Sequence, residues 1–174
     1  MSPPKIHKIF HPNSRKAHQL VRASQRKDGL RASVAIRSHR LQSLLDVYRF
    51  YLRSLPNDRV LTLNELHHIV RDEWLTRFDD QLNAEQAARR TGRPKSPAHV
   101  KMEDLKLREA EQYRTGLEVI DLTHVANVEL FRKWDQNEAA YVEQLRFIRI
   151  SSADTSLASV SRRGKHPVLL DTAE

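Results

Sequence analysis

Residues 13–55 read NSRKAHQLVRASQRKDGLRASVAIRSHRLQSLLDVYRFYLRSL, and this stretch decides the fold that we expect. No proline interrupts it, and Asn13 and Ser14 are both good residues for the N-cap of a helix. Pro56 and Asp58 mark the turn that follows. We therefore predict one long helix over residues 13–55, with Gly29 as its weakest point.

The second half of this helix carries an apolar stripe, whereas the first half has few apolar residues. The residues of the stripe recur at intervals of three, four and seven, as on the buried face of an amphipathic helix. We therefore expect the helix to dock on a core by its C-terminal half. The stripe consists of Val34, Leu41, Leu45, Tyr48, Leu52 and Leu55.

The positive charge of the protein is concentrated in the same region. The 174 residues carry a formal net charge of +8, from 30 Lys and Arg and 22 Asp and Glu. Up to Leu55 there are 12 basic and 2 acidic residues, a net charge of +10, so the remaining 18 basic and 20 acidic residues carry −2. Such asymmetry between two parts of a chain indicates a polyanionic partner.

Five arginines fall on one side of the predicted helix, within roughly 60° of one another at about 100° per residue. A solvated helix face normally interleaves both signs of charge, but here no acidic residue stands four positions away. The planar guanidinium binds phosphate oxygens bidentately, so we interpret the row as a nucleic-acid footprint. Five phosphate contacts predict a slope of log affinity against log salt of about −4. We call this row the arginine line: Arg15, Arg22, Arg26, Arg37 and Arg40.

Residues 1–12 are predicted to form an extended basic arm, because they contain three prolines and no apolar periodicity. Residues 1–27 lack acidic residues and contain Arg and Ser, as mitochondrial presequences do, but Pro3, Pro4 and Pro12 disfavour an early amphipathic helix. No apolar run suits a secretory signal or the roughly 20 residues of a membrane helix.

Residues 56–151 are predicted to form a helical domain. Thr62 and Glu65 have the form of a capping box, which opens a helix that we extend to Arg90. Ser96 and Pro97 begin a further helix that ends near Gly116. We interpret residues 117–126 as an irregular connector and Asn127 as the N-cap of a short helix. Residues 145–150 are predicted to be extended chain. Residues 152–174 are predicted to be disordered. The expected fold is all-α.

Residues 91–95, Thr-Gly-Arg-Pro-Lys, are similar to the Arg-Pro hooks with which chromatin proteins enter the minor groove. The arginine that such hooks place directly before the glycine is absent, so we interpret the segment as an interhelical loop.

Sites for catalysis, metals and cofactors are not predicted. The chain has no Cys, and its nine His lack the ligand spacing of a metal site. We find no glycine-rich phosphate loop, no Gly-x-Ser-x-Gly elbow and no His-Glu-x-x-His motif. We therefore expect a protein that is not an enzyme and binds no metal, cofactor or small-molecule substrate.

Two motifs resemble a known family. The first is FHPNSRKAHQL over residues 10–20, and the second is NVELFRKWD over residues 127–135. Together with their order and spacing, these motifs are similar to those of the translation machinery-associated protein 16 family, over roughly residues 7–151. The resemblance implies a non-catalytic assembly factor in the nucleus or nucleolus, also found with cytoplasmic ribosomes. It would bind precursors of the large (60S) ribosomal subunit, with ribosomal RNA, ribosomal proteins and other assembly factors as partners.

On this interpretation the first motif fixes the start of the arm in ribosomal RNA, and the second stabilises the domain. The family-motif residues are Pro12, Ser14, Ala17, Phe131, Trp134 and Asp135. Charge adds the individual RNA contacts, which we expect at Lys5, Lys8, His11, Arg15, Lys16, Arg22, Arg26, Lys27, Arg37 and Arg40. The alternative is a helical protein–protein adaptor whose basic arm meets an acidic protein.

Overall fold

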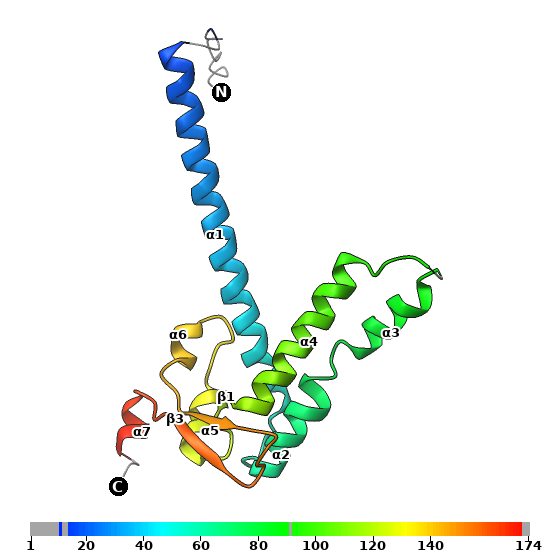
Figure 1. Ribbon diagram of the computed structural model, residues 1–174. Coiled ribbons are helices and arrows are strands. Elements are labelled where there is room, and N and C mark those ends of the chain that lie inside the picture. Colours follow the sequence, from blue (N-terminus) through cyan, green and yellow to red (C-terminus); the bar gives the residue numbers. More distant parts are fainter. Residues whose placement is uncertain (1–10, 12–13, 91, 172–174) are drawn as a thin grey trace. The chain divides into compact units, whose positions relative to one another are not determined.

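The computed structural model describes residue 11 and residues 14–90 and 92–171. The chain divides into an N-terminal unit that ends at Leu44 and a C-terminal unit that begins at Leu45. Helix α1 (Arg15–Ser54) runs without a break and contributes its last ten residues to the C-terminal unit (Figure 1). It matches the helix predicted over 13–55. Ser14 caps it, because its Oγ accepts a hydrogen bond from the Ala17 amide at 3.1 Å.

Only the last turns of α1 are buried, so the predicted docking of its whole C-terminal half is wrong. Val34 and Leu41 are 55% and 48% exposed, whereas Leu45, Tyr48 and Tyr51 are buried. In α1, large apolar side chains become dense only between Val47 and Leu52, where five of the six residues are apolar or aromatic. Before Leu44 the stripe is too sparse to offset the loss of hydration of its charged neighbours.

The chain then forms α2 (Leu63–His68), a π-helical turn η1 (Ile69–Trp74) and α3 (Asp79–Ala88). The capping box is confirmed: Thr62 Oγ1 accepts from the Glu65 amide and Glu65 accepts from the Thr62 amide. The single helix predicted to reach Arg90 is wrong, because the Leu75 amide bonds back to the Val70 carbonyl at 3.1 Å. This wide turn brings Trp74 onto Tyr51, with ring centroids 6.4 Å apart, and ends the regular helix.

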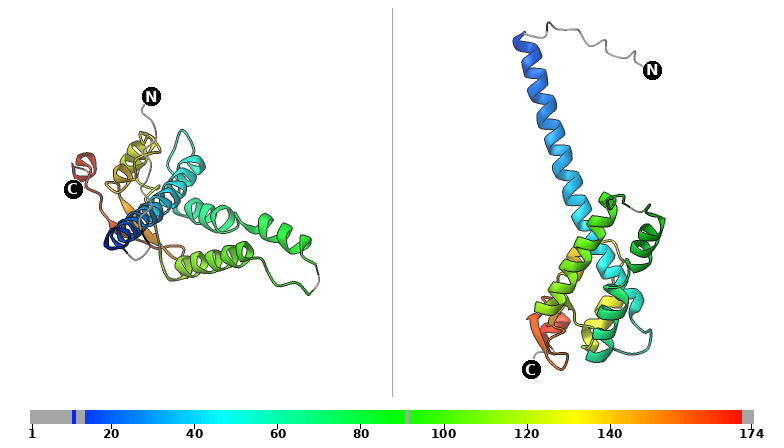
Figure 2. Two further views of the ribbon diagram at one scale, coloured as in Figure 1. Left: turned by 90° about the horizontal axis from the view of Figure 1, so that it is seen from above. Right: turned by 45° about the vertical axis from the view of Figure 1, so that its right-hand side comes forward.

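Helix α4 (Pro97–Thr115) begins and ends as predicted, with Ser96 as N-cap and Gly116 as C-cap. Helices α3 and α4 lie side by side and are joined by the loop at residues 89–96, as both views in Figure 2 show. Among the residues that the structure describes, no helix is both long enough and apolar enough to cross a membrane.

The all-α prediction is wrong, because the C-terminal unit contains an antiparallel sheet of three strands in the order β1-β2-β3. The strands are β1 (Leu117–Ile120), β2 (Phe147–Ile150) and β3 (Ala158–Arg162). In β1, Val119 and Ile120 are both buried, so the alternation that announces a strand is missing. Pairing with the distant β2, where Val119 faces Ile148, makes this segment a strand rather than a connector.

The prediction of disorder over residues 152–174 is also wrong for those residues of the segment that the structure describes. β3 pairs with β2, and helix α7 (Pro167–Asp171) follows it. All five residues of β3 are exposed, so no apolar pattern marks the strand. Polar contacts stabilise it instead: Glu118 of β1 accepts hydrogen bonds from Ser161 at 2.5 Å and Arg162 at 2.9 Å.

The short helices α5 (Val125–Arg132) and α6 (Ala139–Val142) contribute buried residues to the core of the C-terminal unit. His124 caps α5, rather than Asn127 as predicted, and Asn127 is fully buried. The most deeply buried apolar side chains come from α2, η1, β1, α5, α6, β2 and the residues next to them: Leu66, Val70, Ile120, Leu122, Val128, Phe131, Val142, Leu145 and Ile150.

Candidate nucleic-acid interface

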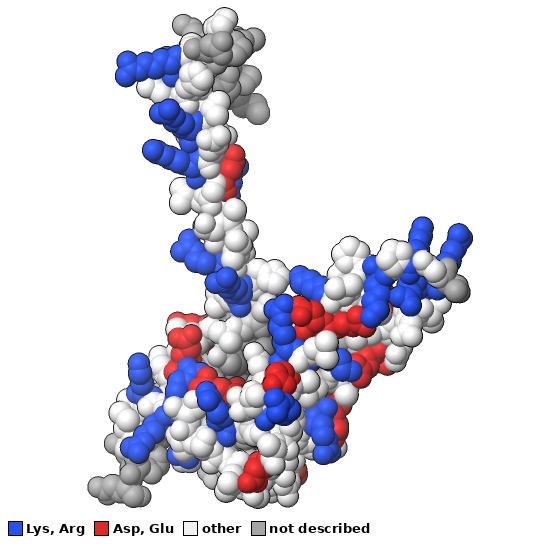
Figure 3. Space-filling model, in the orientation of Figure 1, with Lys and Arg blue, Asp and Glu red and all other residues white. Residues whose placement is uncertain are grey.

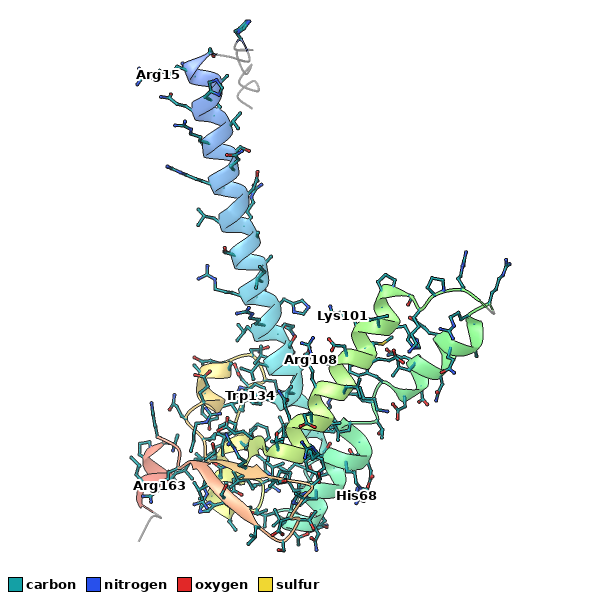
Figure 4. The ribbon with its side chains drawn as sticks, viewed as in Figure 1. Arg15, His68, Lys101, Arg108, Trp134 and Arg163 are labelled. Carbon is teal, nitrogen blue, oxygen red and sulfur yellow. The ribbon has the colours of Figure 1, made fainter. Side chains whose placement is uncertain are left out.

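The first thirty residues of α1, from Arg15 to Leu44, form a cationic helical surface. They contain eight Lys and Arg and one acidic residue, Asp28. From Arg15 to Ser43, every residue except Ala17 is exposed. Figure 3 shows basic side chains along this helix, and Figure 4 shows Arg15 in its first turn. A helix surface with this charge attracts polyanions and has little internal neutralisation.

The continuity of α1 places the arginine line on one face. Arg15 and Arg40 are 25 residues apart, so the line extends over about 38 Å at 1.5 Å per residue. Its widest gap falls between Arg26 and Arg37. In that gap Ser33 lies on the same face, and its hydroxyl donates to the Gly29 carbonyl at 3.0 Å. The structure thus brings the five predicted arginines together along one helical face.

The one carboxylate in this part of α1 points away from the line. Asp28 lies about 140° around the helix from Arg15. It accepts a hydrogen bond from Ser24 at 3.3 Å and lies 3.9 Å from Arg31. Both of those residues are on the far side of the helix, so Asp28 leaves the charge of the arginine line in place.

The remaining predicted RNA-binding residues fall at the edges of this surface. Lys16 and Lys27 are exposed on a flank of α1, and His11 is exposed before it, with its carbonyl accepting from the Ser14 amide at 2.9 Å. Lys5, Lys8 and Pro12 lie outside the described residues.

Sequence reasoning missed an exposed apolar stripe beside the arginine line. Leu30, Val34 and Leu41 are 67%, 55% and 48% exposed and lie within about 40° of one another on α1. Their spacing was visible in the sequence, but it indicated a buried face. In the structure they form a narrow apolar surface adjoining the cationic one.

The apolar residues of the second family motif lie in the core. Phe131 is fully buried and stacks on Trp134, with centroids 5.9 Å apart and planes inclined by 13°. The Trp134 indole, labelled in Figure 4, donates to the Glu138 carbonyl at 2.7 Å. Asp135 Oδ1 accepts from the Asn137 and Glu138 amides at 3.0 and 3.2 Å, which shapes the turn into α6. This motif therefore supports the fold rather than a surface.

A buried polar cluster was also missed. Asp121 is 1% exposed, and its Oδ2 accepts from Arg146 Nε at 2.7 Å. Asn127 bonds the backbone of both residues through its side chain. The only sequence signal was a set of polar residues in an apolar stretch, which looks like an irregular connector when pairing partners are unknown.

No group of three or more His, Asp or Glu residues suited to a metal ion occurs in the described part of the chain. An open groove of about 610 Å³ lies between α3 and α4 and is bordered by Asp79, His99 and Lys106. In the core, the pKa of His67 is lowered, mainly by burial and to a smaller extent by the nearby Arg71. The Nδ1 atom of His67 lies 2.6 Å from the Tyr113 hydroxyl.

These features define a helix-rich α/β protein with a long, exposed cationic helix. A sequence model of the family described as translation machinery-associated protein 16 matches residues 6–152. The chain therefore belongs to the translation machinery-associated protein 16 family, which confirms the resemblance seen in its two motifs.

The chain is similar to relatives of that name in frogs and yeast. The Xenopus laevis protein is 29% identical over 160 residues, which cover 87% of this chain and 79% of that protein. The Saccharomyces cerevisiae protein is 26% identical over 145 residues, 81% of each chain. The Xenopus tropicalis protein is 29% identical over 167 residues, 91% of this chain and 80% of that one.

Proposed function

We propose that this protein is a non-enzymatic ribosome assembly factor that binds precursors of the large (60S) ribosomal subunit. Its partners are ribosomal RNA, ribosomal proteins and other assembly factors, and it acts in the nucleus and nucleolus. Membership of a family named for association with the translation machinery supports a translation-related role. The finer assignment rests on the surface of α1.

One observation carries the RNA assignment: the arginine line is exposed and the nearest carboxylate is turned to the other face. Arginine is the side chain best suited to bidentate phosphate binding. A line of about 38 Å can contact several phosphates along a folded RNA, since the rise of the helix is 1.5 Å per residue. The affinity of such a surface falls steeply with salt.

The adaptor alternative has a specific observation in its favour. Leu30, Val34 and Leu41 are exposed beside the arginines, and a protein partner can bury such a stripe. On a ribosomal precursor both contacts occur together, with RNA on the arginine line and a protein on the apolar stripe.

Sedimentation of the tagged full chain through sucrose gradients, with and without nuclease, tests this proposal. We expect the protein to sediment with large-subunit precursors and to be released by RNA digestion. The variant R15E/R22E/R26E is expected to stay at the top of the gradient. The matched control K133E/R163E/K165E changes the net charge equally on exposed residues of the C-terminal unit and is expected to sediment normally.

Two outcomes would contradict the assignment. Co-sedimentation that survives complete RNA digestion favours the adaptor. Normal sedimentation of R15E/R22E/R26E shows that the arginine line is not the binding surface.

A further inference from the structure

Several acidic residues of the α3–α4 hairpin pair with basic or polar residues of the same segment. Lys106 pairs with Asp79, and Arg77 pairs with Glu109 through two contacts of 2.6 Å. Nearer the tip, Glu85 accepts from the Ser96 hydroxyl at 2.7 Å. Glu103 lies 2.6 Å from Lys95, and this hydrogen bond holds the pKa of Glu103 below its ordinary value. These contacts join the two helices, and of the basic residues in the connecting loop they use only Lys95.

The loop itself is strongly cationic. No Asp or Glu occurs between Glu85 and Glu103, whereas this interval holds three arginines and two lysines. Arg89, Arg90 and Arg93 are exposed, and in the described part of the chain no carboxylate lies within ion-pair distance of them. Figure 3 shows basic side chains gathered at this end of the hairpin. We call these three residues the hairpin-tip arginines.

A backbone hydrogen bond links two of these arginines. The Arg93 amide donates to the Arg90 carbonyl at 3.1 Å, and Gly92 has φ of +80°, a value that side chains disfavour. Two guanidinium groups therefore start from neighbouring points on a loop held by an ordered hairpin.

We propose that the hairpin-tip arginines form a second RNA-binding site, in the C-terminal unit, that engages the phosphates of a folded RNA. Like the proposed function, it takes RNA as the polyanion. Arginine rather than lysine at all three positions favours bidentate phosphate contacts and stacking on unpaired bases. A loop that is only solvated has no reason to lack acidic residues between Glu85 and Glu103. The flanking helices do contain acidic residues, which form ion pairs with basic residues nearby.

Fluorescence anisotropy with the full chain and a labelled RNA stem-loop tests the site. We expect R89Q/R90Q/R93Q to weaken binding roughly tenfold at physiological salt and to make the salt slope shallower by about 2 to 3. The matched control K133Q/R163Q/K165Q removes the same charge elsewhere in the unit and should change the slope by less than half as much. Equal losses for both variants would overturn the site, because net charge alone would then explain binding.

A second measurement needs no variant. Photo-crosslinking of the unaltered protein to thiouridine-containing RNA should yield crosslinked peptides from residues 86–102, and their absence would overturn the proposal. Labelled polyglutamate tests for an acidic protein partner. If the tip variant loses polyglutamate binding as strongly as RNA binding, the tip recognises negative charge in general and the RNA assignment fails.

The assignments of the two RNA-binding surfaces can be tested independently of each other. A normal salt slope for R15E/R22E/R26E together with a shallow slope for the tip variant removes the arginine line and keeps the hairpin tip. The reverse pattern removes the hairpin tip and leaves the proposed function intact.

Discussion

Asn127 and Arg146 form a reciprocal pair of hydrogen bonds inside the C-terminal unit. Asn127 Nδ2 donates to the Arg146 carbonyl at 3.0 Å, and the Arg146 amide donates to Asn127 Oδ1 at 2.8 Å. Asn127 Nδ2 also donates to the Asp121 carbonyl at 2.8 Å. One buried side chain thus joins α5 to the end of β1 and the start of β2.

Replacing this amide should therefore be costly. Asn127→Ala leaves the Arg146 amide and two carbonyls without their side-chain partner, which we expect to lower the free energy of unfolding by about 2–4 kcal/mol. Urea unfolding followed by tryptophan fluorescence measures the loss, since Trp134 reports on the same core. Asn83→Ala, at an exposed position of α3, is the control and should change stability by no more than about 0.5 kcal/mol. Similar values for both variants would contradict the structural role of Asn127.

The capping box gives a prediction about acid stability. Hydrogen bonds from Arg59 first, and then from Thr62, lower the pKa of Glu65 from its ordinary value near 4.5 to about 2. Because the folded pKa is the lower one, this stabilisation is present above about pH 4.5 and is lost as the pH falls towards 2. Glu65→Gln should therefore be less stable than the unaltered protein at pH 6, and the difference should shrink by pH 2. A difference that does not change with pH would contradict this linkage.

The sequence predicted the local features of the fold well. Ser14, Thr62, Ser96 and Gly116 act as helix caps, as their residue types and spacing indicated, because capping depends on atoms within a few positions. The charge of α1 was equally visible, since charge belongs to the residue and not to its contacts.

Features that depend on distant partners were missed. β1 becomes a strand only through β2, and β3 is held by Glu118 from across the sheet. The burial of Val34 and Leu41 was predicted from spacing alone, but a stripe is buried only where another element covers it. In the sequence the hairpin tip looked like an ordinary loop. Only the structure shows that the nearest carboxylates, Glu85 and Glu103, bond to Ser96 and Lys95 and not to the tip arginines.

Gly164 tests the order of the C-terminal segment. Its φ is +87°, and an added Cβ would lie 2.7 Å from Leu169 and 3.0 Å from the Gln144 carbonyl. Gly164→Ala should therefore cost about 1–3 kcal/mol through backbone strain and contact with a neighbouring main chain. Hydrogen exchange should become faster in β3 and α7. Gly29→Ala, which meets nothing within 4 Å, is the control and should stabilise α1 slightly. Unchanged exchange in β3 and α7 would contradict this packing.

Ser33 gives the most selective test of the arginine line, because it lies on the same face between Arg26 and Arg37. Ser33→Asp places one negative charge among these guanidinium groups and should cancel about one phosphate contact. The slope of log affinity against log salt for an RNA stem-loop should then become shallower by about 0.7 to 0.9. Ser24→Asp adds the same charge on the opposite face of the helix, about 180° away, and should change the slope far less. Because the two variants have the same composition and net charge, only the position of the charge distinguishes them. Equal slopes would show that α1 binds RNA without using one face.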